Sequence, residues 1–395
     1  MLNYYKVQFA SLMLTFHVHV NPWHMSLPMA FDVPCLMDGI VALGKRHRAH
    51  ICQEAEDVDV LVLKDRALSS FRVSLHNTDT AALLATVLTL VTLEYTRTSY
   101  AHWGVHIAGA HRIMEAAGGV DIARNNAPLR SFLVMILWYD LITALVSRRP
   151  PVFDKEYLVS VMAWRSAHEW SLVGLNGFPD EIFDLIHDIA CASAMARHSP
   201  IPRATAADLE RRLWVAEMDA NNPSSSSLFD CWRQAMLLYC ARVFGTGAHN
   251  PFSHAPSSNM TSDGFDAPLT SMAEGILAIV ASMDPTSAMQ KQCLLPVVLA
   301  ASELGPHSTT HRALRADVEG YCERWNHLVG LRMYLSALHF IRSVWVCRDH
   351  HVDDDDSRPV WWGTVVEQME RADGGASSGG SSALVQAPTK EWMFG

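Results

Sequence analysis

The sequence predicts an all-α protein in which stacked antiparallel helices form one large helical domain. Apolar residues recur at helical spacing along most of the chain, whereas the strict alternation of half-buried strands is scarce. Hydrophobic residues make up 49% of the 395 residues and charged residues only 18%, so the chain can bury a sizeable core. There is no repeat of fixed period. We therefore expect one helical body over residues 1–372 and a flexible tail over residues 373–395, which includes the Gly- and Ser-rich stretch 374–382.

The first twenty residues are apolar, but they lack the basic start and the small-residue cleavage site of a signal peptide. We expect them to form a helix that leads into the fold. Residues 83–93 (LLATVLTLVTL) predict an apolar helix. A second helix follows the polar break after it, with Trp103, Ile107, Ala110, Met114 and Ala117 on one face, and the pair Gly118-Gly119 predicts its end.

A third helix is expected to start near Pro128 and to end before Pro150-Pro151. Its apolar stripe consists of Leu129, Phe132, Leu133, Ile136, Leu137, Leu141 and Ala144. Residues 132–146 are the best candidate for a membrane span, but Asp140 lies in their middle. No run reaches the roughly 18 uninterrupted apolar residues that a span needs. We expect no membrane contact.

Helical patterns continue to the end of the predicted body. Helices are expected at residues 180–198, 204–218, 229–244, 269–283, 286–304 and 308–325, and a last long helix places Leu331, Leu335, Leu338, Ile341 and Trp345 on one face. Loops are expected at residues 221–227 and 247–267, where polar residues, Pro and Gly accumulate.

Charge and cysteine usage exclude several classes of protein. The formal charge is −10 with a pI near 6.0, which argues against a broad basic face for gripping DNA. The eight cysteines contain no Cys-x-x-Cys pair, so a structural zinc site is not expected. We expect free thiols in a reducing compartment.

Two histidine clusters invite a metal hypothesis. His102 and His106 have i, i+4 spacing, but Trp103 stands where a zincin has glutamate, so ordinary helix-surface histidines are favoured. His350-His351 precede the acidic run 353–356, which lacks the spacing and the glycine of an EF-hand and is expected to be a solvated loop. There is no Gly-x-Ser-x-Gly elbow, no phosphate-binding Gly-Lys-Ser/Thr loop and no GxGxxG. The sequence thus predicts no catalytic residues, no metal site, no cofactor and no enzyme activity.

Two basic clusters and one glycosylation match remain. The cluster Lys45 to Arg48 (KRHR) is expected to be a solvated helix end, with a nuclear import signal as the alternative. Arg148-Arg149-Pro150-Pro151 closes the third helix, where arginines suit the helix dipole and the orphan carbonyls, with binding of an anionic effector as the alternative. Asn259-Met-Thr261 matches a glycosylation acceptor by chance, because nothing indicates secretion.

Four blocks of sequence follow one another in a recognisable order. They are residues 21–30 with the small-residue helix through Ala42, Leu43 and His50; residues 83–119 with Trp103, His106, Gly109-Ala110 and Arg112; residues 132–151, ending in Arg149-Pro150-Pro151; and residues 294–349 with Trp325, Trp345 and Arg348, continuing to Trp361. Together they resemble the regulatory region of fungal binuclear zinc-cluster transcription factors, the fungal-specific transcription factor domain. The resemblance covers roughly residues 4–372.

The resemblance implies transcription regulation, a nuclear localisation, and a helical domain that modulates activity or dimerises. Such factors usually carry six N-terminal cysteines that hold two zinc ions, and this sequence lacks them. It is therefore expected to be either a truncated product or a member without its own DNA-binding module. Zinc binding and DNA contact carry over to no residue here.

We therefore expect a transcription regulator that acts through protein partners of the transcription machinery, with a homodimer and a small-molecule effector as further partners. It is expected to reach DNA only indirectly or through the absent module, and to control a metabolic pathway such as one for specialised metabolites. The first alternative is a non-enzymatic helical scaffold or adaptor in a nuclear complex. The second is an all-helical enzyme, which would need a polar pocket with convergent acids or histidines.

Overall fold

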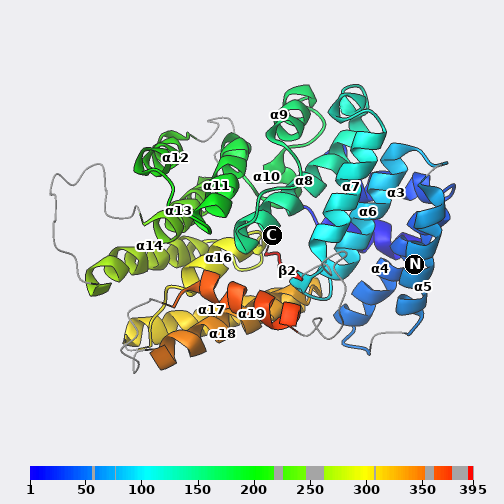
Figure 1. Ribbon diagram of the computed structural model, residues 1–395. Helices are drawn as coiled ribbons and strands as arrows, with labels where there is room; N and C mark the ends of the chain where they lie inside the picture. The colour runs from blue at the N-terminus through cyan, green and yellow to red at the C-terminus, as the bar shows by residue number, and fades with distance from the viewer. Residues whose placement is uncertain are drawn as a thin grey trace.

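The computed structural model describes residues 1–55, 58–75, 77–217, 226–245, 262–306, 308–351, 360–375 and 390–394. These residues are almost entirely helical, which confirms the all-α prediction. The early helices gather on one side of the molecule, drawn in blue and cyan in Figure 1, and the helices drawn in green lie on the other side. The helices nearest the C-terminus run along a third side, and strand β2 lies near the centre (Figure 1).

The first half of the chain contributes the short helices α1 (Leu2–Tyr4) and α2 (Ala10–Leu12), joined by a π-helical turn at Tyr5–Phe9, and then the longer helices α3 (Pro22–Ala30), α4 (Pro34–Ile51), α5 (Val58–Ser74), α6 (Thr80–Tyr95), α7 (Trp103–Ala116) and α8 (Ala127–Ser147). The expected N-terminal helix therefore ends at Leu12. Beyond it, Thr15 N and Phe16 N both donate to Gly174 O, at 2.9 and 3.1 Å, so these amides find their acceptor in a short helix far away in the sequence.

The second half adds α9 (Lys155–Trp164), α10 (Leu172–Asn176), α11 (Phe183–Ala196), α12 (Arg203–Val215), α13 (Ser226–Phe244), α14 (Ser262–Ser282), α15 (Ala288–Lys291), α16 (Leu294–Ala301), α17 (Thr309–Val329), α18 (Met333–His351) and α19 (Trp362–Gly375). Short 3₁₀ turns lie at Val120–Ala123 and Asp180–Ile182. Most of the predicted helices are confirmed, with ends shifted by a few residues. The loop expectations are wrong where helices begin earlier, because α13 starts at Ser226 and α14 starts at Ser262; residues 221–225 and 247–261 of the two expected loops lie outside the described residues.

Helices α6, α7 and α8 form the centre of the core. Every residue of α6 from Ala81 to Tyr95 is buried, and the hydroxyls of Thr86, Thr89 and Thr92 bond to the carbonyl four residues earlier, so these polar groups are satisfied. The four residues of the predicted α7 face that lie within the helix are buried, and Ala117 stands at its C-cap.

Helix α8 is buried all around rather than along one stripe. Asn126 caps it through a bond from Leu129 N to the Asn126 side chain at 3.0 Å. The helix is long and apolar enough to cross a membrane by composition alone, but its apolar window is wholly buried inside the protein. Its burial is that of a core helix.

Two predictions about the last helices are wrong. Residues 286–304 do not form one helix, because α15 and α16 are separated at Gln292 and Cys293. The ring of Pro296 would meet the carbonyl of Gln292 in a continuous helix, whereas in the first turn of α16 it is tolerated. Leu335 is 41% exposed and lies off the buried face of α18, which is shared instead by Tyr334, Leu338, Ile341 and Trp345.

A two-stranded sheet joins the C-terminal segment to the body. Strand β1 (Tyr100–Ala101) pairs antiparallel with β2 (Glu391–Trp392), with Tyr100 opposite Trp392. Trp392, Met393 and Phe394 are at most 3% exposed. The expectation of a flexible tail is therefore wrong for residues 390–394, because their aromatic side chains fill the core. It is also wrong for residues 373–375, which belong to α19, and residues 376–389 lie outside the described residues.

Candidate functional site

The predicted basic corner at the end of α8 is built by a left-handed residue. Arg148 has φ +50°, and the amides of Arg148 and Arg149 donate back to Leu145 O and Ala144 O, at 3.3 and 3.1 Å. The backbone thus ends the helix in the manner usually reserved for glycine. The guanidinium that reaches an orphan carbonyl of α8 is that of Arg197, whose Nη1 donates to Ser147 O at 3.1 Å.

Arg149 bridges two carboxylates. Its Nε donates to Oε1 of Glu391 at 2.6 Å, and its Nη1 donates to Oδ1 of Asp140 at 3.2 Å. The other oxygen of Asp140 accepts from Val152 N and Phe153 N, at 2.7 and 2.9 Å. Burial raises the pKa of Asp140, although Arg149 and these two amides act in the opposite direction. Asp140 therefore fixes the path of the chain after Pro150-Pro151.

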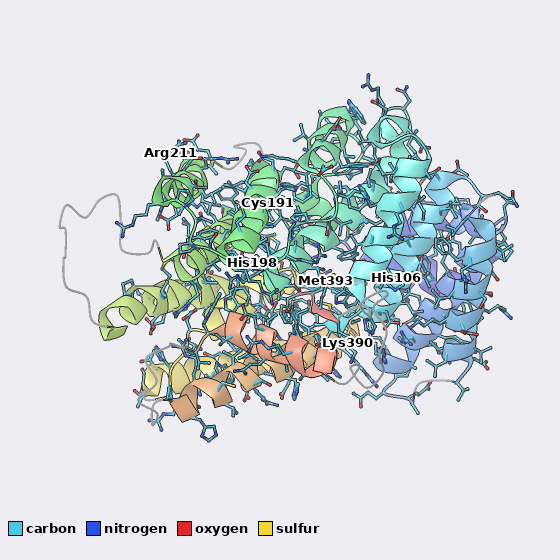
Figure 2. All side chains as sticks on the ribbon, viewed as in Figure 1. His106, Cys191, His198, Arg211, Lys390 and Met393 are labelled. Carbon is cyan, nitrogen blue, oxygen red and sulfur yellow. The ribbon has the colours of Figure 1, made fainter. Side chains whose placement is uncertain are left out.

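A pocket of about 390 Å³ opens at this corner. Its lining consists of Arg148, Arg149, Pro150, Cys191, Ala194, Met195, Arg197 and His198. Figure 2 labels Cys191, which lies on α11, and His198, which follows the end of that helix. The pocket is cationic, but each guanidinium already faces a carboxylate. Arg148 Nη1 lies 3.6 Å from Glu367, and Arg197 Nη2 lies 2.7 Å from Glu370. An anion bound here would have to compete with these carboxylates, so the structure does not favour the anionic-effector alternative at this corner.

A second, larger pocket of about 480 Å³ lies between α14, α16 and α17. Its walls include Leu277, Val297, Leu314 and Val318, and Arg324 is among its polar lining residues. Arg324 Nη2 donates to Oε1 of Gln290 at 2.8 Å, whereas its Nε has no partner among the described residues. Apolar walls with a few polar groups, at this volume, are typical of a small-molecule site.

The histidine pair at the start of α7 does not form a ligand set. His102 is exposed and stands at the N-cap with ψ +58°, outside the helix, while His106 is half-buried one turn later. Burial lowers the pKa of His106. No group of three or more His, Cys, Asp or Glu that could hold a metal occurs among the described residues. Asp353–Asp356, Asn259 and Thr261 lie outside them.

The expectation that Lys45 to Arg48 form a solvated helix end is wrong for its two middle residues. Arg46 is 1% exposed, and its Nη1 donates to Leu93 O at 2.6 Å. His47 is 2% exposed, and its ring nitrogens lie 2.9 Å from the hydroxyl of Tyr4 and 2.8 Å from Val329 O. Because α4 packs against α6 and α17, these two side chains satisfy carbonyls in the last turns of both neighbours.

One cysteine has a histidine within reach. Sγ of Cys191 lies 3.7 Å from Nδ1 of His187, and the other ring nitrogen of His187 lies 3.3 Å from Phe153 O. Burial, with a contribution from Asp188, raises the pKa of Cys191. A catalytic thiol needs the opposite shift, toward the thiolate. We therefore interpret this pair as part of the packing, and it gives no support to the enzyme alternative.

Sequence reasoning missed Lys291, the last residue of α15. Its side chain is buried, and Nζ donates to Leu12 O at 2.5 Å and to Leu14 O at 2.9 Å. It lines a small internal cavity. The only signal in the sequence is a single lysine just ahead of the apolar run LLPVVLAA, which also fits an exposed helix end.

Comparison with known protein families gives a match over most of the chain. Residues 1–372 match a protein family described as the fungal specific transcription factor domain. No curated protein and no solved structure matches the chain. The matched range includes all four sequence blocks and every helix except the end of α19.

Proposed function

Because the chain belongs to the fungal-specific transcription factor domain family, a family of transcription regulators, we propose that its helical body controls a metabolic pathway through protein contacts and a small-molecule signal. The observation that carries the proposal is the family match over residues 1–372. The blocks that carried the resemblance include α6, α7 and α8, the buried centre of the fold. The role that we propose for the body is therefore regulatory.

The charge of the chain indicates that the helical body does not itself read DNA. The formal charge of −10 disfavours binding to phosphates, and two of the four residues in the KRHR cluster are buried. In this proposal a zinc-cluster module or a partner reads the DNA, and the helical body acts in the nucleus on partners of the transcription machinery. The purified chain is expected to bind DNA weakly and without sequence preference. Tight, sequence-specific binding at moderate salt would contradict this assignment.

The small-molecule signal is supported by the pocket between α14, α16 and α17. Its volume of about 480 Å³ lies in the range of ligand pockets, and its apolar walls offer area for burial. Specialised metabolism is the pathway class we propose. Transcript profiles after gene deletion test it: we expect a coherent set of metabolic genes to change, and an unchanged transcriptome would count against the regulator.

A scaffold in a nuclear complex is the competing function, since the same fold supports it. Affinity purification separates the two. A regulator is expected to change partners with growth condition, whereas a scaffold keeps one constant set of structural partners. Substituting a residue that lines the pocket, such as Leu314→Glu, is expected to abolish the condition dependence of a regulator and to leave a scaffold's partners unchanged.

A further inference from the structure

A small internal cavity lies where several distant parts of the chain meet. Its lining includes Leu12 and Met13 from the N-terminal segment, Asn176 from α10, Lys291 from α15, and Tyr334 from the start of α18. Hydrogen bonds hold these parts together, because Gly174 O accepts from Thr15 N and Phe16 N, and the hydroxyl of Tyr334 donates to Lys291 O at 2.8 Å. A ligand in this cavity would contact both halves of the fold at once.

The cavity contains a cation without a counter-ion among its lining residues. Lys291 Nζ has two carbonyl oxygens as acceptors, and no Asp, Glu, His or Cys is among the described residues that line the cavity. The other titratable groups facing it are Tyr95, Tyr139 and Tyr334, and burial raises the pKa of all three, so they stay neutral. Buried ammonium groups are normally paired, because an isolated charge in a low-dielectric interior is strongly destabilised.

Three further hydrogen-bond donors belong to residues that line the same cavity and have no acceptor among the described residues. They are Nε1 of Trp23, Nε1 of Trp138 and Nδ2 of Asn176, each on a residue that is at most 5% exposed. Buried donors normally find partners, and an unmade bond destabilises the folded state. Unpaired donors on residues around an ammonium group suit a ligand that accepts hydrogen bonds and carries a negative charge.

The size of the cavity limits that ligand. The cavity has a volume of about 30 Å³. One buried water molecule needs about 10–15 Å³, so the cavity has room for roughly two. The two oxygens of a carboxylate occupy comparable space. Larger oxyanions such as sulfate exceed it.

We propose that this cavity binds a small carboxylate anion, of the size of formate or acetate, between Lys291 and the donors of Trp23, Trp138 and Asn176. The site differs from the pocket between α14, α16 and α17 and from the basic corner of α8. The bound anion would contact the N-terminal segment, α10 and α15 at once. A role for this contact as a metabolic signal rests on the proposed regulatory function.

Proton linkage gives the site a pH dependence of known sign. Burial lowers the pKa of Lys291 from 10.5 to about 7. Below pH 7 the amine is charged and attracts the anion directly. Above pH 7 the amine is mostly neutral, so carboxylate binding takes up one proton, and the affinity is expected to fall about tenfold for each further pH unit.

The test uses the purified full chain in a buffer free of carboxylates. Sodium formate, acetate and propionate are titrated at pH 6 against sodium chloride and sodium sulfate at equal ionic strength, and the thermal midpoint is recorded. We expect a saturable rise of about 3 °C or more at 100-fold excess over Kd for formate or acetate. Propionate and sulfate exceed the cavity and are expected to give no saturable rise, and the rise with chloride is expected to be smaller than that with formate or acetate, because two carboxylate oxygens can accept from more of the donors.

Two variants and a control tie the effect to the cavity. Lys291→Met fills similar space without charge and is expected to fold and to lose the response. Trp138→Phe removes one N–H donor and is expected to weaken acetate about tenfold. The control Lys6→Met makes the same change at an exposed lysine and is expected to respond like the parent chain.

Three outcomes would overturn the proposal: an equal rise with every sodium salt, a response that survives in Lys291→Met, or no rise with any carboxylate. In each of them the cavity holds water only. These outcomes leave the transcriptional role standing, because gene deletion tests that role independently. Conversely, the chain could bind acetate while deletion of its gene changes no transcripts. That result would support the binding site and contradict its use in regulation.

Discussion

Arg149 at the end of α8 holds Glu391 at 2.6 Å, although 242 residues separate them in the sequence. The second carboxylate oxygen of Glu391 accepts from Gly104 N at 2.9 Å, in the first turn of α7, where the helix dipole favours a negative group. One carboxylate therefore connects the start of α7 and the end of α8 to the C-terminal strand. The same guanidinium also donates to Asp140, through Nη1 of Arg149.

Replacing Arg149 with Met should destabilise the fold strongly. Two carboxylates would be left without their partner, and that of Asp140 is only 1% exposed. Removal of one member of a buried ion pair lowers the free energy of unfolding by about 3–5 kcal/mol. Urea denaturation measures the change. Arg371→Met provides the control, because Arg371 is 75% exposed and should shift stability by no more than about 0.5 kcal/mol. Equal losses in both variants would contradict the role of Arg149.

The C-terminal segment should contribute to the core as much as a central helix does. Phe394 is fully buried, with its ring centroid 5.2 Å from that of Phe340 and 5.3 Å from that of Trp392. Phe394→Ala is expected to lower the free energy of unfolding by about 3–5 kcal/mol, since it leaves a cavity in packed surroundings. Phe31→Ala is the matched control at a residue that is 72% exposed. A loss below about 1 kcal/mol at Phe394 would show that the segment is not part of the stable fold.

The helices could be predicted from the sequence, because the spacing of apolar residues within one helix shows which of its faces is buried. The buried face of α7, with Trp103, Ile107 and Met114, follows from 3.6-residue spacing alone. The break before α16 depends on Pro296, which the apolar pattern around it conceals. The placement of Trp392 was not predictable in this way, because three apolar residues at the end of a polar stretch carry no periodicity.

The polar residues of the candidate sites were harder to predict, since their partners lie far away in the sequence. Arg46 looks like part of an exposed basic run until α6 places Leu93 O beside it. Lys291 looks like a helix-surface lysine until residues 12–14 close over it. A sequence pattern records which face is apolar, but it does not record which carbonyl from another helix will meet a long side chain.

Glu94 should make the protein lose stability in acid. Its carboxylate pairs with Lys64 and Arg97, and although burial alone would raise its pKa, these two cations lower it to about 2. The folded state thus binds its proton more weakly than the unfolded state, whose pKa is near 4.5. The stabilisation is present above pH 4.5 and is lost as the pH falls toward 2.

The Glu94→Gln variant isolates this effect. Because both cations are partly exposed and screened, we expect it to be less stable than the parent by about 1–3 kcal/mol at pH 7, with the gap closing at low pH. Chemical denaturation at a series of pH values measures the gap. A difference that does not change between pH 6 and pH 3 would show that the ion pairs contribute nothing to acid sensitivity.

Lys291 should act on stability in the opposite direction. Its folded pKa of about 7 lies below the unfolded value of 10.5, so between these values the unfolded chain binds more protons. The penalty of burying the amine is therefore largest below pH 7 and is relieved as the pH rises toward 10.5. Lys291→Met removes the penalty, and in carboxylate-free buffer at pH 6 it is expected to be more stable than the parent by about 1–4 kcal/mol.

The stability advantage of Lys291→Met should shrink steadily from pH 7 to pH 10, as measured by urea denaturation of both chains. Lys6→Met should track the parent at every pH, and a Lys291→Met chain less stable than the parent at pH 6 would mean that the bonds to Leu12 O and Leu14 O outweigh the burial of the charge.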